Sequence, residues 1–154
     1  MSVEHSTLTG SDLHEPKGTA AANTGQVYIA NGSGSGTWTA HHNRCVLTVR
    51  IDDISSADIV YVVTPIAGTI SKIYSVINAA ITSGDATVTA KLGSTALTNG
   101  AITIAHSGSG AATVDSCTPT ANNTVTVGQA ITLQTDGGST NACEGVFTIE
   151  ITPS

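Results

Sequence analysis

The sequence predicts an all-β protein: an antiparallel β-sandwich with a jelly-roll-like body, preceded by an extended N-terminal arm. From Cys45 onward, apolar and polar residues alternate in short runs that recur about every 8–12 residues, with turn residues between them. These runs do not alternate with helical patterns, which argues against a parallel α/β fold. We therefore expect residues 1–44 to form the arm and a Gly/Ser hinge, and residues 45–154 to form the β-sandwich domain.

The arm is predicted from residues 12–38, which contain few large apolar residues and end in the run from Gly32 to Gly36. Such a segment buries too little apolar surface to offset the entropy lost on ordering, so alone it is expected to be extended. The Gly/Ser run is interpreted as a flexible spacer. Neither a helical pattern nor a Lys-Ser/Thr pair follows it, as a phosphate-binding loop would require.

The strands of the domain follow from period-two alternation. Residues 69–81 fit a helix or a strand with a bulge, and their β-branched residues and the β-type context favour the strand. The Asn99-Gly100 pair predicts a hairpin turn, since Asn-Gly readily adopts positive φ. The expected strands lie, in order, at residues 45–51, 59–66 and 69–81, and around residues 88–92, 102–104, 114–119, 125–127, 131–133 and 147–151.

The core of the domain must come mostly from Val, Ile, Leu and Ala, because aromatic residues make up only 3% of the chain. Phe147, Ile149 and Ile151 are expected to face inward on the closing strand. Periodicity does not encode strand order, so a jelly roll and an immunoglobulin-like sandwich both stay open.

The charge pattern excludes several partners. The net charge is −6, and no Lys or Arg follows Lys91, which argues against nucleic-acid binding because that needs a basic surface. The longest apolar run falls well short of the ~20 residues that span a bilayer, so no membrane partner is expected. The first residues lack the features of a signal peptide, which predicts synthesis in a cytoplasm.

The three cysteines, Cys45, Cys117 and Cys143, do not form a disulfide framework, because their number is odd and none belongs to a CxxC pair. Free buried thiols are the favoured interpretation. One bridge, for example between Cys117 and Cys143, stays open if their strands are neighbours.

Residues with catalytic or metal-binding potential do not form a recognisable motif. Adjacent residues His41 and His42 would point to opposite sides of an extended chain, so they are interpreted as a solvated hinge rather than a metal site. Asp52, Asp53 and Asp58 lack the spacing of a calcium loop and are interpreted as a turn. We therefore expect no catalytic residues, no metal and no cofactor, and we do not expect an enzyme.

The chain resembles the capsid decoration (cement) proteins of tailed bacteriophages. In the arm, the likeness lies in residues 13–18 (LHEPKG) and 23–28 (NTGQVY), followed by the Gly/Ser run and Trp38. In the domain, it lies in residues 83–92 (SGDATVTAKL) and continues to the Asn-Gly pair. The likeness covers most of the chain, and it includes no catalytic residues.

The resemblance implies a small β-domain, usually a homotrimer, that binds the outer surface of the phage head and stabilises it. It implies that the arm contacts the major capsid protein or a neighbouring subunit, as an extended segment that can add a strand to an exposed sheet edge. It also implies location on the capsid exterior of the virion, after synthesis in the bacterial host cytoplasm.

The candidate capsid-contact residues are the few sizeable apolar groups of the arm, because such groups dominate binding energies. These are Leu13, Pro16, Val27, Tyr28, Ile29 and Trp38. For Tyr28 and Trp38 an alternative is that both rings pack onto the chain's own β-domain. The alternative function is a head-fibre or tail-associated module that binds a host receptor through the loops at residues 107–111 and 135–141.

Overall fold

A computed structural model describes residues 22–23, 26–33, 36–40 and 44–154. The contacts divide the chain into two units, residues 1–42 and residues 43–154. We call the second unit the body, and each unit is described by itself. Every pair of strands in both units is antiparallel, so the predicted all-β class is confirmed.

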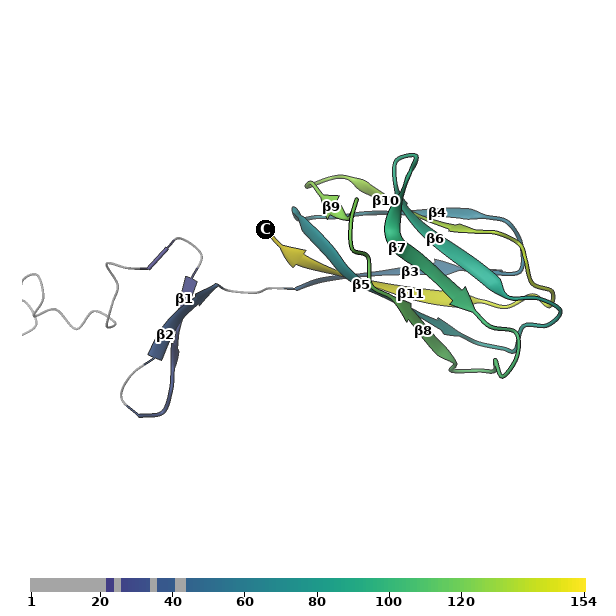
Figure 1. The fold of residues 1–154 in the computed structure, drawn as a ribbon, viewed down its shortest axis with the longest axis horizontal. Coiled ribbons are helices and arrows are strands. Elements are labelled where there is room, and N and C mark those ends of the chain that lie inside the picture. The colour runs from purple at the N-terminus through teal and green to yellow at the C-terminus, as the bar shows by residue number, and fades with distance from the viewer. Residues whose placement is uncertain (1–21, 24–25, 34–35, 41–43) are drawn as a thin grey trace, which may run out of the picture. The chain divides into compact units, whose positions relative to one another are not determined.

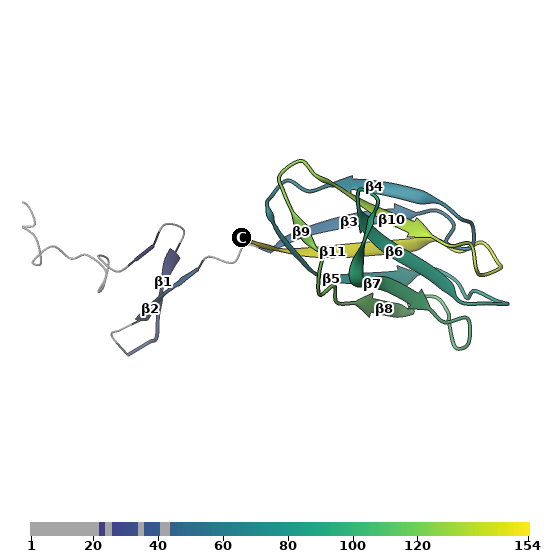
Figure 2. The same cartoon turned by 45° about the horizontal axis from the view of Figure 1, so that its top comes forward.

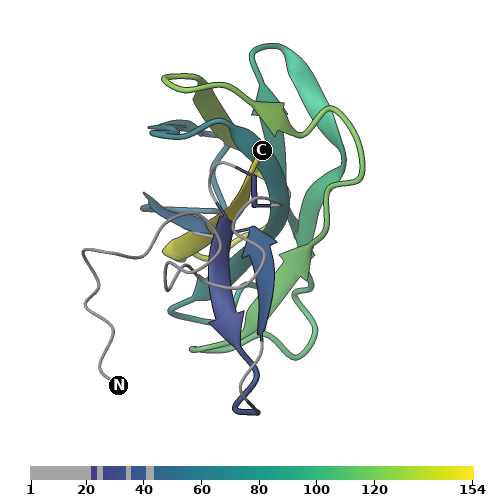
Figure 3. The same ribbon diagram turned by 90° about the vertical axis from the view of Figure 1, so that its left-hand side faces the viewer.

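The first unit contains a β-hairpin formed by β1 (Gln26–Ala30) and β2 (Gly36–Ala40). The two strands lie side by side in every view, including Figure 3. Gly36 is required because a Cβ at this position would clash with the Ile29 carbonyl oxygen and come within 2.8 Å of the Tyr28 ring. The Gly/Ser run, interpreted from the sequence as a spacer, thus connects two paired strands. The predicted anchors Leu13 and Pro16 lie outside the described residues.

The body consists of two antiparallel sheets that face each other (Figures 1 and 2). One sheet has the order β3-β11-β5-β8, with β9 also paired to β5, and the other has the order β4-β10-β6-β7. The strands are β3 (Cys45–Ile51), β4 (Ile59–Val63), β5 (Gly68–Ile77), β6 (Ala86–Leu92), β7 (Thr95–Ile104), β8 (Val114–Cys117), β9 (Thr124–Val125), β10 (Ala130–Thr135) and β11 (Gly145–Pro153).

The strand order identifies the sandwich as a jelly roll. Strands β8 and β9 both pair with β5 and act as one interrupted strand. The interruption is held by Asn123, whose side-chain amide donates to the carbonyls of Ile70 and Pro119. Numbered along the body, the sheets then have the orders 1-8-3-6 and 2-7-4-5, the arrangement of a double-sheet jelly roll. The immunoglobulin-like alternative is therefore excluded.

The core lies between the sheets and consists mostly of Ile, Val, Leu and Ala, as the composition predicts, with isoleucine the most frequent of them. Phe147, Ile149 and Ile151 all face inward from β11, which runs between β3 and β5. The largest fully buried side chains are Phe147, Ile51, Ile54, Ile70, Ile73, Ile77, Ile81, Ile104, Ile131, Leu133, Ile149 and Ile151.

The predicted turn at Asn99-Gly100 is wrong. Strands β6 and β7 are instead connected through Gly93, whose φ of +60° lies in the left-handed region that favours glycine. Asn99 does adopt a positive φ of 56°, but within a bulge of β7. The bulge lets the backbone of Thr98 bond to Ala121 rather than to β6.

Two other predicted boundaries shift. The second strand ends at Val63 rather than Ile66, because the buried Thr64 hydroxyl donates to the Ile66 carbonyl and turns the chain. For residues 69–81 the strand interpretation is confirmed over Gly68–Ile77. The register shift in its pairing falls between Glu150 and Ile151 of β11.

Candidate binding surfaces

The described residues contain no group of three or more His, Cys, Asp or Glu side chains that could hold a metal ion. No helix in this part of the chain is long and apolar enough to cross a membrane.

Asp53 organises the turn that the sequence predicts at residues 52–58. Its carboxylate accepts hydrogen bonds from the hydroxyl of Ser55 at 2.6 Å, from the amide of Ser55 at 2.9 Å and from the amide of Cys143 at 3.2 Å. The two bonds from Ser55 are the main cause that lowers the pKa of Asp53 to about 2. The carboxylate thus fastens the turn to the segment that enters β11.

Replacing Asp53 by asparagine is expected to destabilise the body by about 1–2 kcal/mol at pH 7, because hydrogen bonds to a charged acceptor are lost. The folded-state pKa of about 2 lies below the ordinary 3.8, so this contribution is complete above about pH 4 and lost as the pH falls from about 4 to 2. Urea unfolding at pH 7 and at pH 2 measures it. The neighbouring Asp52→Asn, at an exposed ion pair with Arg50, is the control and should change stability by less than about 0.5 kcal/mol.

The three cysteines are all free thiols. Cys143 is buried, as expected, whereas Cys45 and Cys117 are only half-buried. Cys45 and Cys117 lie on opposite edge strands of the five-stranded sheet, which places them too far apart for a bridge. Burial raises the pKa of the Cys117 thiol to about 11, so it stays protonated and unreactive at neutral pH.

The structure brings together the two loops that the receptor-binding alternative uses. Both pack on the connection from β5 to β6. The Ser109 hydroxyl accepts a hydrogen bond from the Ile81 amide at 3.1 Å, while Thr82 and Thr140 exchange backbone hydrogen bonds. Loops 107–111 and 135–141 therefore share one end of the body.

The hairpin residues among the predicted anchors divide between its two faces. Tyr28 and Trp38 are directly opposite in register, and their ring centroids lie 5.3 Å apart with a 59° angle between the planes. Tilted aromatic pairs of this kind stabilise strand pairing. Val27 and Ile29 alternate with Tyr28 and remain 38% and 54% exposed. The rings therefore support the hairpin, and the two aliphatic side chains are available for contact.

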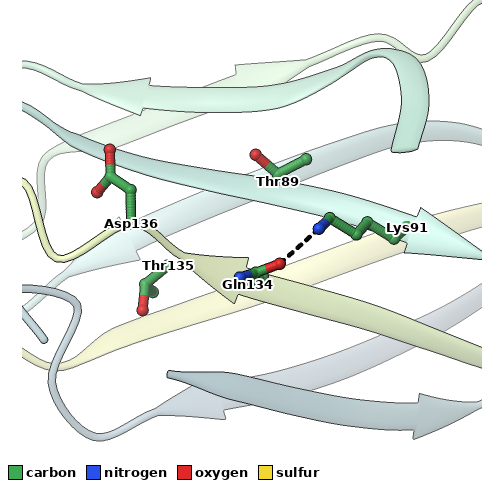
Figure 4. Close-up of a pocket in the computed structure, with 5 residues that line it drawn as sticks. All are labelled: Thr89, Lys91, Gln134, Thr135 and Asp136. Carbon is green, nitrogen blue, oxygen red and sulfur yellow. Dashed lines mark hydrogen bonds between the residues drawn. The ribbon is translucent and has the colours of Figure 1, made fainter. Parts of the chain in front are cut away.

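A hollow of about 240 Å³ lies on the outer face of the four-stranded sheet (Figure 4). Thr89 and Lys91 come from β6, Gln134 and Thr135 from β10, and Asp136 directly follows β10. These five residues define what we call the hollow. All stand on or beside the two central strands of the sheet, which hold side chains more rigidly than loops do.

Hydrogen bonds position the charged groups of the hollow. The Lys91 ammonium donates to the Gln134 side-chain oxygen at 2.5 Å (Figure 4). Asp136 accepts from the amides of Thr87 at 3.0 Å and Gly138 at 2.9 Å. Burial raises the pKa of Asp136, but these hydrogen bonds outweigh it and hold the pKa below its ordinary value. At neutral pH the hollow thus presents an ammonium, an amide, a hydroxyl and a carboxylate.

Sequence reasoning did not find the hollow. Lys91 and Gln134 are 43 positions apart, and only the register of β6 and β10 makes them neighbours. The available signal was weak: Thr89 and Lys91 occupy the outward-facing positions of an alternating strand, as many surface residues do.

A search of protein-family models found no match to this chain, and no curated protein matches it either. The protein is therefore classified by its fold alone, as a jelly-roll β-sandwich that follows a β-hairpin unit in the sequence.

Proposed function

We propose that the chain is a structural protein of a phage virion, a capsid decoration (cement) protein that binds the outer surface of the head. In this proposal its body assembles as a homotrimer, and its N-terminal segment fastens it to the major capsid protein or to a neighbouring subunit. The observation that carries the proposal is the hairpin. It belongs to a separate unit of the chain, and Val27 and Ile29 are exposed on one of its faces.

The hairpin fits a fastening role for a physical reason. A segment already paired as a hairpin loses less conformational entropy on binding than an unpaired arm would, so more of its contact energy appears as affinity. The Tyr28–Trp38 ring pair supports that preorganisation. In a trimer, three such segments would act together, and each weak contact would be strengthened through avidity.

The body fits the role of a covering domain. The buried core residues that the structure describes all lie within residues 43–154, so we expect the body to fold without the hairpin. In the proposed role, such a body covers the head surface while the N-terminal segment supplies the contact.

The test is co-sedimentation with expanded heads of the same phage that lack the protein. Full-length protein and a form without residues 1–42 are compared side by side, after circular dichroism has verified that both are folded. We expect saturable pelleting of the full-length form only. Equal pelleting of both forms would show that the N-terminal segment is not the fastener.

A receptor-binding module of a head fibre or tail is the second candidate. It is favoured by the convergence of loops 107–111 and 135–141 on one end of the body, since binding sites are commonly built from clustered loops. Failure of both forms to pellet in the experiment above would favour this candidate, and binding would then be sought on host cells.

A further inference from the structure

The outer face of the four-stranded sheet carries a row of side chains that extends from the hollow to the edge strand β4. Tyr61 on β4, Thr132 on β10 and Lys91 on β6 are direct cross-strand neighbours. Thr132 points outward between these two neighbours and is only 7% exposed, as expected for a short side chain between longer cross-strand neighbours. Tyr61 and the hollow therefore form one continuous surface.

Tyr61 supplies an accessible aromatic ring to this surface. It is 67% exposed and stands between the outward-facing Ile59 and Val63 on the same strand. By contrast, Tyr74 on the other sheet is covered by the Lys72 ammonium, which lies 4.8 Å from the ring centroid. An exposed ring beside polar groups suits a ligand with both an apolar face and hydroxyl groups.

The hollow retains unused hydrogen-bonding capacity. Within the described residues, the Lys91 ammonium uses one of its three donors, and the Gln134 amide nitrogen and the Thr89 hydroxyl make no hydrogen bond. Lys91 also has no carboxylate partner among these residues, whereas Arg44 and Arg50 are paired with acids. Donors and acceptors are thus concentrated where a polar ligand could replace water.

We propose that this surface binds an oligosaccharide of two or more sugar rings. One ring stacks its apolar face on Tyr61, and the hydroxyls of another bond to Lys91, Gln134 and Thr89. The size follows from the strand spacing: β4 and β6 are separated by two inter-strand steps, roughly 10 Å, which a single ring does not span.

Other ligand classes fit this surface less well. A nucleic acid needs a basic surface, and Lys91 is the only cation that the described residues place on the four-stranded sheet. A wholly apolar ligand would displace water from the ammonium, amide and carboxylate of the hollow without replacing the hydrogen bonds that water makes. A carbohydrate can stack on the Tyr61 ring and also form hydrogen bonds with the polar groups of the hollow.

The inference does not depend on capsid attachment, because the proposed capsid contacts lie in residues 1–42. The test uses the full-length protein on an array of bacterial surface oligosaccharides, with neutral and uronate-bearing members. The oligosaccharide that binds most strongly is then titrated by calorimetry against Tyr61→Thr and Lys91→Met. Threonine keeps the β-branched preference for a strand, and methionine keeps the aliphatic stem of lysine.

We expect each of these substitutions to weaken binding about tenfold, the scale of one aromatic or charged contact. The matched controls are Tyr74→Thr and Lys72→Met, the same changes on the outer face of the other sheet, and they should alter affinity less than about twofold. Absence of binding to every oligosaccharide on the array would overturn the proposal. So would binding that Tyr61→Thr and Lys91→Met leave unchanged.

Discussion

Replacing Phe147 by alanine is expected to cost the body about 3–5 kcal/mol of stability, the usual loss when a buried phenylalanine is truncated. Phe147 is the only Phe in the chain, and it is fully buried on β11, between β3 and β5. With so few aromatic residues in the core, no other large ring is available to fill the cavity. The expected loss is a large share of the ~5–15 kcal/mol that stabilises a typical domain.

Urea unfolding followed by far-UV circular dichroism measures this loss. Fluorescence is a poor monitor here, because the only tryptophan, Trp38, lies in the unit of residues 1–42 rather than in the body. The adjacent Thr148→Ala, on the outward face of the same strand, is the control and should cost less than about 1 kcal/mol. A loss below about 1 kcal/mol for Phe147→Ala would mean that the core repacks around the cavity.

Alternation predicted the strands of the body well, because one face of each is buried against the other sheet. Residues 45–51 show this directly: the predicted strand and β3 coincide, with Val49 and Ile51 inside and Val46 and Arg50 outside. A half-buried strand must alternate, so local sequence is sufficient to find it.

Strand order and turn position could not be predicted in this way, because they depend on contacts between residues that are distant in sequence. Asn99 has the positive φ that its residue type favours. Whether that backbone makes a turn or a bulge depends on residues 120–121: the Ala121 carbonyl accepts from the Thr98 amide, and the Thr120 amide donates to the Thr98 carbonyl. Local propensity thus predicted the conformation of the residue but not its role.

The candidate surfaces were predictable only as far as they depend on local sequence rather than on strand pairing. The candidate anchors of the hairpin were proposed from composition, because apolar residues are rare in residues 12–38. Their division between two faces required the register that places Tyr28 opposite Trp38. The hollow required the pairing of β6 with β10, which no local pattern encodes.

Val27 and Ile29 lie on the opposite face of the hairpin from the Tyr28–Trp38 pair, so their part in capsid binding can be tested separately. Replacing both Val27 and Ile29 by threonine should keep the hairpin, because threonine is also β-branched and the Tyr28–Trp38 pair is untouched. The exposed apolar contact would be lost. At about 1 kcal/mol for each side chain, and with three segments acting together in a trimer, we expect the apparent affinity for heads to fall about 100-fold or more.

Co-sedimentation over a range of protein concentrations measures this affinity. The matched control is Val46→Thr with Val63→Thr, two similarly exposed valines of the body, which should leave pelleting unchanged. Near-normal binding of the Val27 and Ile29 variant, with no binding of the form lacking residues 1–42, would assign the contact to other residues of that segment. Leu13 and Pro16 would then be the next to replace, since they are the remaining aliphatic candidates there.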